Sequence, residues 1–340
     1  MKRLLSLIIL MLWTMNLFAC GSPSFSDELP ETEEIITDAI ATEIAETEPI
    51  TTDGIDKGWQ LDRTTKYVSI SYNAYGQPSA FGVSEDPSVS ADGGTLFEYR
   101  FLSNERYTDT SSIRKFTLNG RQSLVVIPDE PLEGNPTVWR TEFFEAFDTV
   151  DKTLLEKGWH IIYHNVSDMY GAPSSLAMMH EFQDFVTVAL GLSGKPVLFG
   201  FSRGGLYAVN YAAEYPDCVG GIYLDAPVQD IRDWPCRDDM KGTRERKECM
   251  SLYGLTDETL PFFDGNPIDK AEKIADIPLI IVAGLADTTV VWERNGAITA
   301  ERVKAAGGHV KTILKENCEH HPHSLDDPTP VVEFIEKYCM

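Results

Sequence analysis

The clearest structural signal in this chain is VLFGFSRGG, residues 197–205. The apolar run 196–200 predicts a short strand that ends in a turn, and residues 204–215 have the pattern of a helix. Between them lies Gly-x-Ser-x-Gly, with Ser202 at its centre. In this setting the pattern is typical of a nucleophile elbow, because the serine must project from a tight strand-to-helix turn in which side chains at the glycine positions would collide. The sequence therefore predicts that Ser202 is a nucleophile.

Strands and helices alternate on both sides of this turn. Apolar runs predict strands at 123–127, 160–163, 196–200, 219–224, 278–283 and 310–314. Helical spacing of apolar residues predicts helices at 140–156, 174–190, 204–215, 294–306 and 330–338. Strands that are apolar on both faces favour an α/β fold, with a mostly parallel sheet and helices on both sides. Residues 57–122 alternate polar and apolar residues, as at 67–72 and 95–101, and predict antiparallel strands at the sheet edge.

Two aspartates are candidates for the acid that supports a nucleophilic serine. The serine requires a general base, and the base requires an orienting carboxylate, in the chain order serine, acid, histidine. Asp287 comes just after the predicted strand 278–283, and Asp225 comes directly after the strand 219–224. Both therefore fall at carboxyl ends of strands, where such sheets bind their ligands. Asp287 is the predicted acid and Asp225 is the alternative.

Three histidines in four residues follow the last predicted strand, in the stretch EHHPHSL, residues 319–325. His320 is the predicted base, His321 is the alternative, and His323 is expected to brace the loop. A histidine cluster also suggests metal binding. A metal site needs more ligands, and the sequence offers no suitable cysteine or HExxH partner elsewhere. We therefore predict no metal site and no cofactor.

The oxyanion hole requires backbone N–H groups that face the tetrahedral oxygen. Arg203, the residue after the nucleophile, is expected to supply one of them. The second is expected from the loop 128–138, where Asn135 is the candidate. Trp139 and Arg140 follow this loop and are expected to line the substrate site, although core packing for Trp139 and ion pairing with local acids for Arg140 are alternatives.

About 50 mostly polar residues, 227–276, interrupt the alternation of strands and helices. A loop of this length inside a domain usually has a function or a small structure of its own. Its aromatic residues, such as Trp234, are expected either to stack on substrate or to form the core of the insertion. Cys236 and Cys249 lie close in sequence, and they are the first choice for a disulfide bond outside the cytoplasm.

The N-terminus has the pattern of an export signal, residues 1–20. Two basic residues precede a short apolar run, 4–13, and the tetrapeptide LFAC, 17–20, resembles the lipobox of bacterial lipoproteins. By that resemblance Cys20 is lipidated and becomes the first residue of the mature protein. The expected location is therefore outside the cytoplasm, with membrane contact through the lipid anchor only.

Charge divides the rest of the chain. Residues 21–56 hold eleven Asp and Glu and no Lys or Arg, which predicts an acidic, disordered tether before a catalytic domain at 57–340. The whole chain has 53 acidic and 29 basic residues. Such an excess of negative charge repels phosphate backbones, so nucleic-acid binding is not expected.

Residues 123–340 resemble the α/β-hydrolase superfamily, on the elbow GFSRGG, the acid loop GLADTTV and the histidine loop EHHPHSLDDP. The stretches GNPTVWRTEFF, LDAPVQDIRDWP and HHPHSLDDP are similar to a narrower group of secreted bacterial proteins described as esterases, often encoded beside enzymes of polysaccharide degradation. The resemblance implies an ester substrate, such as a carbohydrate acyl ester, and a cap inserted after the sixth strand at 227–276. Glu319 departs from the glycine that commonly precedes the catalytic histidine.

Serine-dependent hydrolysis of a carboxylic ester, on a small molecule or an oligosaccharide, is the leading hypothesis. A peptidase or a lipase with the same triad is an alternative, although no repeat domain of the kind found in many related peptidases is visible and the insertion is polar. A non-catalytic surface binding module is the alternative of a different class, because fold does not imply activity. The intact set of Ser202, Asp287 and His320 argues against it.

Overall fold

The computed structural model describes residues 58–74, 77–89 and 94–340. The predicted signal, Cys20 and the acidic tether lie outside these residues. Within them, eleven strands form one sheet in the order β11-β10-β9-β8-β6-β7-β5-β4-β3-β1-β2. No helix in the described ranges has the length and apolar character needed to cross a membrane.

The half of the sheet that holds the predicted site is parallel. Its six strands are β7 (His160–His164), β6 (Thr137–Arg140), β8 (Val197–Phe201), β9 (Gly221–Asp225), β10 (Leu279–Gly284) and β11 (Val310–Lys315). Because these strands run in one direction, their carboxyl ends meet at one edge of the sheet. Ser202 and Asp225 lie at this edge, at the ends of β8 and β9.

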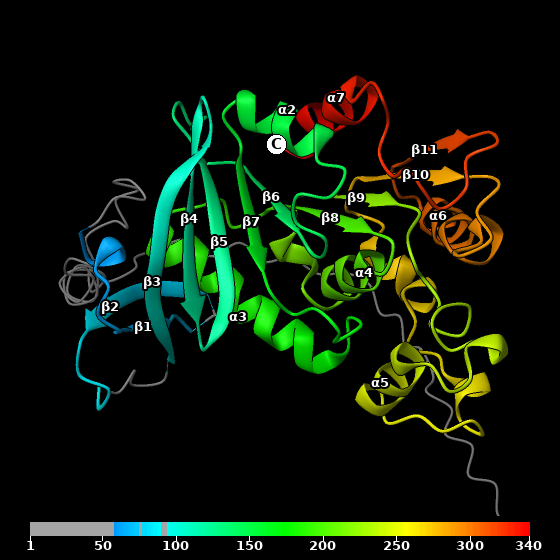
Figure 1. Ribbon diagram of the computed structural model, residues 1–340, viewed down its shortest axis with the longest axis horizontal. Helices are drawn as coiled ribbons and strands as arrows, with labels where there is room; N and C mark the ends of the chain where they lie inside the picture. The colour runs from blue at the N-terminus through cyan, green and yellow to red at the C-terminus, as the bar shows by residue number, and fades with distance from the viewer. Residues whose placement is uncertain (1–57, 75–76, 90–93) are drawn as a thin grey trace, which may run out of the picture. The chain divides into compact units, whose positions relative to one another are not determined.

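The other half of the sheet is antiparallel, as residues 57–122 predict (Figure 1). It consists of β1 (Lys66–Tyr72), β2 (Pro78–Ser84), β3 (Thr95–Thr108), β4 (Ser111–Leu118) and β5 (Arg121–Pro128). Asn119 and Gly120 join β4 to β5 with positive φ angles of 49° and 76°, the conformation of a tight hairpin turn. The predicted strand 123–127 is β5, which pairs antiparallel with β7.

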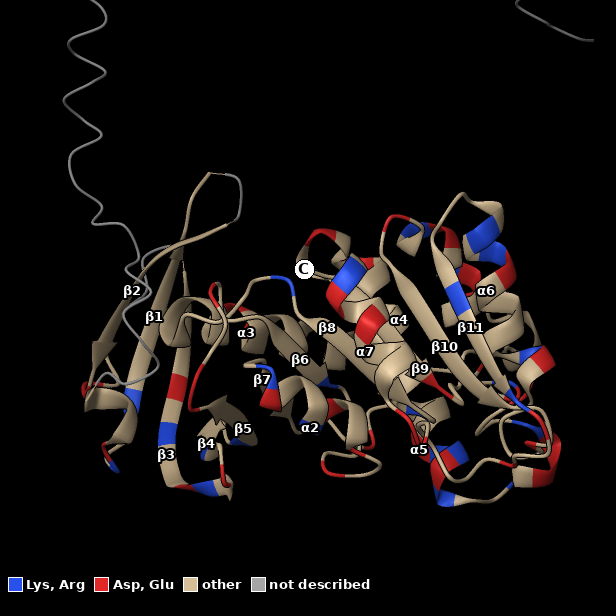
Figure 2. Ribbon diagram, turned by 90° about the horizontal axis from the view of Figure 1, so that it is seen from above, with Lys and Arg blue, Asp and Glu red and all other residues tan. Residues whose placement is uncertain are grey.

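Helices cover both faces of the sheet. On one face, α2 (Thr149–Glu156) lies beside α7 (Thr329–Tyr338), and on the opposite face lie α3 (Pro173–Leu190), α4 (Gly204–Glu214) and α6 (Gly296–Ala305) (Figure 1). Side chains of one strand alternate between the two layers, so Leu198 packs in the core under α3 and α4 while Phe199 packs under α2 and α7. Figure 2 shows that β8 and β10 carry no charged residue, whereas α5 (Arg244–Leu252) and α6 carry both signs.

The segment after β5 differs from the prediction. Residues Thr137–Arg140 form β6, a strand that the sequence analysis did not predict, and the predicted helix 140–156 begins only at Thr149. Between them, three residues without the freedom of glycine have positive φ angles: Phe143 (54°), Glu145 (69°) and Phe147 (51°). The aromatic residues of this loop happen to fall at helical spacing, which explains the wrong prediction.

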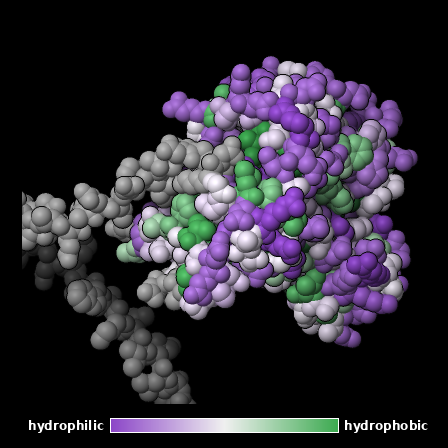
Figure 3. Space-filling view, turned by 60° about the vertical axis from the view of Figure 1, so that its left-hand side comes forward, coloured by the Kyte–Doolittle hydropathy of each residue, from purple (hydrophilic) through white to green (hydrophobic). Residues whose placement is uncertain are grey.

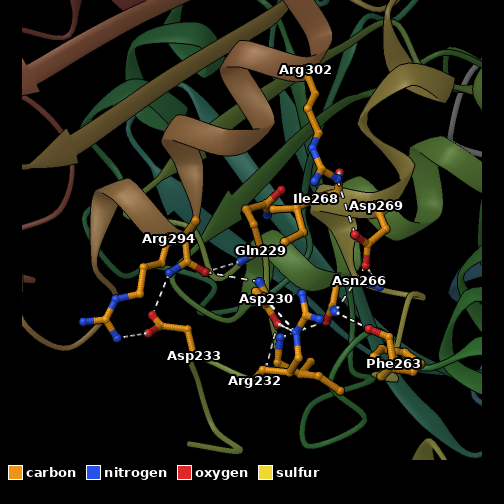
Figure 4. Close-up of polar contacts among 12 residues, drawn as sticks. Gln229, Asp230, Arg232, Asp233, Phe263, Asn266, Ile268, Asp269, Arg294 and Arg302 are labelled. Carbon is orange, nitrogen blue, oxygen red and sulfur yellow. Dashed lines mark hydrogen bonds and ion pairs between the residues drawn. The ribbon is translucent and has the colours of Figure 1, made fainter. Parts of the chain in front are cut away.

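The insertion between β9 and β10 contains α5 (Arg244–Leu252) and several short 3₁₀ turns. One turn, Pro267–Ile274, packs on α4 and α6. Polar contacts hold the insertion to the sheet domain: Arg294 donates to Asp233 at 2.8 Å, and Arg302 donates to the carbonyl of Ile268 at 2.6 Å (Figure 4).

The five cysteines among the described residues are free thiols, so the disulfide bond predicted between Cys236 and Cys249 is not formed in this structure. The two thiols are buried in the insertion. On the face seen in Figure 3, apolar residues form small separate patches among hydrophilic ones. A small apolar patch of this kind is normal for a protein surface.

Candidate active site

The turn between β8 and α4 has the geometry of a nucleophile elbow. Ser202 has a φ angle of 49°, which is unusual for a residue with a side chain and is typical of strained functional turns. Its N–H donates to the carbonyl of Asp225 at 2.9 Å, and its carbonyl accepts from Val228 at 2.9 Å. A Cβ atom at Gly200 would lie 2.9 Å from the Cβ of Ala208. The close packing of strand and helix therefore requires glycine here.

The structure brings Ser202, His320 and Asp287 into one hydrogen-bonded chain. The Oγ atom of Ser202 lies 2.9 Å from Nε2 of His320, and Nδ1 of His320 lies 2.7 Å from Oδ2 of Asp287. The three residues come from the elbow, from the loop after β11 and from the loop after β10. In this arrangement Nδ1–H donates to the carboxylate, so Nε2 is free to accept the serine proton.

Asp287 is fixed and ionised by its surroundings. Its second oxygen, Oδ1, accepts from the N–H groups of Thr289 at 2.8 Å and Val290 at 2.9 Å. Burial alone would raise the pKa of the carboxyl, but the hydrogen bonds from His320, Val290 and Thr289 outweigh burial and hold the pKa below its ordinary value. The carboxylate is therefore charged at neutral pH, as an orienting acid must be.

Asp225, the alternative acid, forms a second pair beside the first. Its Oδ1 lies 2.7 Å from Nδ1 of His323, and its Oδ2 accepts from the N–H of Ser324 at 2.8 Å and from the hydroxyl of Tyr223 at 3.1 Å. Asp225 and His323 are both buried. The ring of His323 lies 4.9 Å from the ring of His320. The expectation that His323 braces the loop is therefore incomplete, because it is also one half of a buried, hydrogen-bonded aspartate–histidine pair.

His321, the alternative base, does not contact Ser202 or Asp287 through a hydrogen bond. Its side chain is exposed, and its ring stacks on Phe147 with 5.6 Å between centroids. Burial of its ring and the neighbouring rings of His323 and His320 lower its pKa. Of the three histidines, only His320 has the position of a base for Ser202.

A cavity of about 170 Å³ lies beside Ser202. Its wall consists of the loop after β6, the elbow and the histidine loop; the lining residues are Phe143, Ala146, Phe147, Phe201, Ser202, His320, His321 and His323. No residue of the insertion between β9 and β10 is among them. The expected cap therefore packs on α4 and α6 and does not enclose this cavity.

The structure corrects the expected oxyanion hole. Asn135 precedes β6, at the edge of the sheet opposite Ser202, where its side chain donates to the carbonyl of Gly191 at 2.9 Å. The prediction that it faces the tetrahedral oxygen is wrong, because β6 carries the chain across the sheet before the loop that reaches the site. In the described part of the chain, the N–H groups of Arg203, Glu142 and Phe143 have no hydrogen-bond partner.

Two of the residues predicted to contact substrate are buried away from the cavity. Arg140 is fully buried and forms a bidentate pair with Asp151, with both N–O distances at 2.6 Å. Trp139 packs in the core against Phe182 and Tyr211. Neither side chain is available to a substrate, so the expected substrate contacts are wrong, and the alternatives, core packing for Trp139 and an ion pair for Arg140, are confirmed.

Two other predicted residues have different surroundings. Trp234 packs near Tyr170, with 6.1 Å between ring centroids, and does not line the cavity beside Ser202. The guanidinium of Arg203 forms ion pairs with Glu142 at 3.3 Å and Asp168 at 3.0 Å. It also lies over the ring of Phe143 at 5.2 Å, so the side chain braces the loop after β6.

The sequence analysis did not identify the aromatic wall formed by Phe143 and Phe147. Both side chains are more than a third exposed and line the cavity beside Ser202. The signal in the sequence is the run EFFEAF, residues 142–147, but it becomes informative only when β6 is assigned as a strand. The role of Asp225 as the partner of His323 was also missed.

Comparisons with solved structures agree with this architecture. An acylaminoacyl peptidase in complex with Z-Gly-Gly-Phe-chloromethyl ketone aligns with a TM-score of 0.52 at 15% identity, over 72% of this chain and 42% of that one. The acylaminoacyl peptidase of Pyrococcus horikoshii aligns with a TM-score of 0.50 at 14% identity, also over 72% and 42%. The chain has the α/β-hydrolase fold.

An S-formylglutathione hydrolase from Agrobacterium tumefaciens aligns with a TM-score of 0.49 at 14% identity, over 70% of this chain and 96% of that one. No protein-family model matches the chain, and no curated protein sequence matches it. At these identities the two alignments with TM-scores of 0.50 and 0.52 support the α/β-hydrolase fold and say nothing about substrate. Function therefore has to be argued from the site.

Proposed function

We propose that this α/β-hydrolase is a serine hydrolase that cleaves carboxylic esters with small acyl groups. The observation that carries the proposal is the hydrogen-bonded chain from Ser202 through His320 to Asp287. Its two distances, 2.9 Å and 2.7 Å, fall in the range in which a base can take a proton from a nucleophile.

The reaction proceeds in two halves. The Oγ atom of Ser202 attacks the ester carbonyl while Nε2 of His320 takes the hydroxyl proton, and the charged Asp287 stabilises the imidazolium. The tetrahedral intermediate collapses, the alcohol leaves with the proton from His320, and an acyl-enzyme remains. Water then attacks the acyl-enzyme with His320 as the base, which releases the acid and restores Ser202.

The N–H of Arg203 and one from the loop after β6 form the oxyanion hole. Arg203 directly follows the nucleophile, and Glu142 and Phe143 lie where β6 ends beside β8. Their N–H groups are unpaired, so they can donate to the oxygen without breaking an existing hydrogen bond. The side chains of Arg203 and Glu142 form an ion pair across the gap, which holds the two donors in place.

The cavity supports a small acyl group. Its volume of about 170 Å³ is below the range typical of sites for drug-sized ligands, roughly 300–1,000 Å³. Phe143, Ala146 and Phe147 make one wall apolar, which suits a short acyl chain, while the alcohol part extends toward solvent. A carbohydrate ester is our proposal for the physiological substrate, and it rests on the resemblance of the loop sequences to secreted bacterial esterases.

A panel of p-nitrophenyl esters tests the proposal on the full-length protein. We expect hydrolysis of the acetyl ester to exceed that of the octanoyl ester, and acetylated xylo-oligosaccharides to release acetate. The matched p-nitroanilide separates ester from amide cleavage. Ser202→Ala should abolish turnover, whereas Ser251→Ala, which removes an exposed serine of α5, should not change it. Equal activity in Ser202→Ala and wild type would contradict the mechanism.

We further propose that the protein acts outside the cytoplasm, held by a lipid on Cys20. The support is the signal-like segment 1–20, which ends in LFAC. Expression in a bacterial host with a labelled fatty acid tests this directly. Wild type should become labelled and sediment with membranes, and Cys20→Ala should not be labelled. A protein that is unlabelled and remains in the cytoplasm would contradict this location.

A further inference from the structure

The histidine loop has more binding capacity than a serine triad requires. The triad uses His320, but the same turn places His321 and His323 at its side, with all three pairs of ring centroids 4.8–4.9 Å apart. One nitrogen atom from each ring lies within 4.8 Å of the others. The catalytic proposal gives no role to two of these three imidazoles.

Buried carboxylates orient two of the three rings. Asp287 accepts from Nδ1 of His320, and Asp225 accepts from Nδ1 of His323, both at 2.7 Å. A carboxylate on one ring nitrogen fixes the tautomer and leaves the lone pair of the other nitrogen available to a ligand, as in carboxylate–histidine–zinc sites. The two carboxylates also supply two negative charges near the rings, equal to the charge of a divalent cation.

The nitrogen of His323 opposite Asp225 faces the cavity without a partner. The side chain of His323 is 96% buried and lines the cavity, yet its Nε2 atom accepts no hydrogen bond from any described residue. Among the described residues, this atom is not one of the fully buried, unpaired polar atoms. It is therefore accessible from the cavity that the ring lines. The lone pair of Nε2 of His323 is therefore open to the cavity and available to a ligand.

We propose that His320, His321 and His323 bind one Zn²⁺ ion at the mouth of the cavity, and that the bound ion blocks the serine reaction reversibly. Zinc takes imidazole nitrogens at about 2.0–2.1 Å in a tetrahedral arrangement, which requires nitrogens roughly 3.3 Å apart. The nitrogens lie within 4.8 Å of one another before binding, so the exposed His321 must rotate away from Phe147 and His320 must move from Ser202 toward the ion. Water occupies the fourth position.

Inhibition follows from the shared ligand. Nε2 of His320 cannot hold zinc and accept the proton of Ser202 at the same time, because both use one lone pair. Zinc binding therefore replaces the 2.9 Å contact between Oγ and Nε2. The ion competes with catalysis and takes no part in it. Zinc binding does not depend on the proposed function, whereas inhibition by zinc rests on the proposed serine reaction.

Binding is measured first, in a way that needs no activity. Zn²⁺ is titrated into the full-length protein with a chromogenic chelator as competitor, and Co²⁺ is added to the apoprotein to record its visible absorption. We expect one ion per chain and the intense Co²⁺ bands of a four-coordinate site. Ser202→Ala should bind zinc at least as tightly as wild type, because His320 then has no competing hydroxyl. Binding by this inactive variant separates the metal site from the proposed function.

Variants then locate the site. Losing a ligand should weaken binding by more than the roughly 10–100-fold that losing an orienting partner costs, so we expect a decrease above that range in His321→Ala. His309→Ala is the matched control, because His309 is also exposed and also stacks on a phenylalanine, with 5.4 Å between centroids. Cys318→Ser tests the nearby thiol. Both controls should bind zinc like wild type.

Inhibition is measured as the zinc concentration that halves each variant's own metal-free rate, with reversal by a chelator. The half-inhibitory concentration should rise with the dissociation constant in His321→Ala and stay unchanged in His309→Ala. Unchanged zinc binding in His321→Ala, or loss of binding in Cys318→Ser, would overturn the proposal. Zinc binding without inhibition in an active enzyme would also overturn it.

Discussion

Two aspartate–histidine pairs lie side by side in this site, and only one reaches the nucleophile. Asp287–His320 and Asp225–His323 have the same N–O distance, 2.7 Å, and both aspartates lie where parallel strands end. His320 contacts Ser202 at 2.9 Å, whereas His323 lies deeper, between Phe147 and Phe201. The comparison shows that an Asp–His pair alone does not identify the base. The histidine must also lie within hydrogen-bond distance of the serine hydroxyl.

Replacing either histidine with alanine should give the largest difference in activity between the two pairs. His320→Ala removes the base and should lower kcat by about 10⁶-fold, as loss of the triad histidine does in subtilisin. His323→Ala removes a ring that does not touch Ser202, and should lower kcat/KM by about tenfold or less. Steady-state kinetics on p-nitrophenyl acetate measures both. Comparable losses in the two variants would mean that both pairs take part in proton transfer.

Replacing each aspartate with asparagine should mainly reduce catalysis in one pair and mainly reduce stability in the other. Asp287→Asn should lower kcat by about 10⁴-fold with little change in fold, because the amide favours the wrong tautomer of His320. Asp225→Asn should keep most of the activity and lower the free energy of unfolding by about 1–3 kcal/mol, because its carboxylate accepts from Ser324 and Tyr223 as well as His323.

Urea denaturation and kinetics on the same preparations measure both effects. The matched variant Asp327→Asn changes an exposed aspartate in the next turn and should alter neither quantity strongly. A larger loss of kcat in Asp225→Asn than in Asp287→Asn would reverse the assignment of acid.

His160 and His164 are also buried, but neither ring is hydrogen-bonded to a carboxylate. Burial lowers the pKa of His160 to about 4, and burial together with the charge of Arg121 lowers the pKa of His164 to about 4. A folded pKa below the unfolded value near 6.5 means that the stabilisation is complete above pH 6.5 and is lost as pH falls toward 4. Each residue should cost about 2 kcal/mol of stability at pH 5 relative to pH 7.

Urea denaturation at a series of pH values measures this loss. His164→Gln should reduce the slope between pH 6.5 and 4, and His309→Ala, an exposed histidine, should not. A wild-type free energy of unfolding that stays constant over this range would contradict the expected burial of neutral histidine.

The smallest expected effect is a change in acyl-chain preference when Phe147, in the cavity wall, is replaced. Phe147 packs on His321 and His323 and lines the cavity. Phe147→Ala should enlarge the cavity and raise the ratio of butanoyl to acetyl ester hydrolysis by a few fold, in line with about 1–3 kcal/mol per methylene as an upper limit. Leu314→Ala, an exposed apolar residue of β11, is the control and should leave the ratio unchanged. An unchanged ratio in Phe147→Ala would place the acyl group elsewhere.

The parallel half of the sheet could be predicted from the sequence because its strands are apolar on both faces and are separated by helices of regular period. The predicted helices at 174–190, 204–215 and 330–338 match α3, α4 and α7 within one residue at each end. Ser202, Asp287 and His320 could be chosen for the same reason: each follows a strand that the pattern identifies, and the fold brings those strand ends together.

The rest of the site could not be predicted because short strands and special backbone angles leave weak signals. β6 has only four residues, and the positive φ angles at Phe143, Glu145 and Phe147 cannot be inferred from aromatic side chains. Missing β6 placed the oxyanion loop one connection too early, at Asn135. Trp139 and Arg140 were therefore predicted to line the substrate site, whereas both lie in β6.

The proposed mechanism requires Ser202 to be the nucleophile. A fluorophosphonate probe, which reacts with activated serines, is added to the full-length protein, and mass spectrometry of peptides locates the adduct. The account predicts one adduct, on Ser202, that is absent when His320 is changed to alanine and persists when His323 is changed to alanine. A well-folded wild-type protein that stays unlabelled, or an adduct on a different serine, would contradict it.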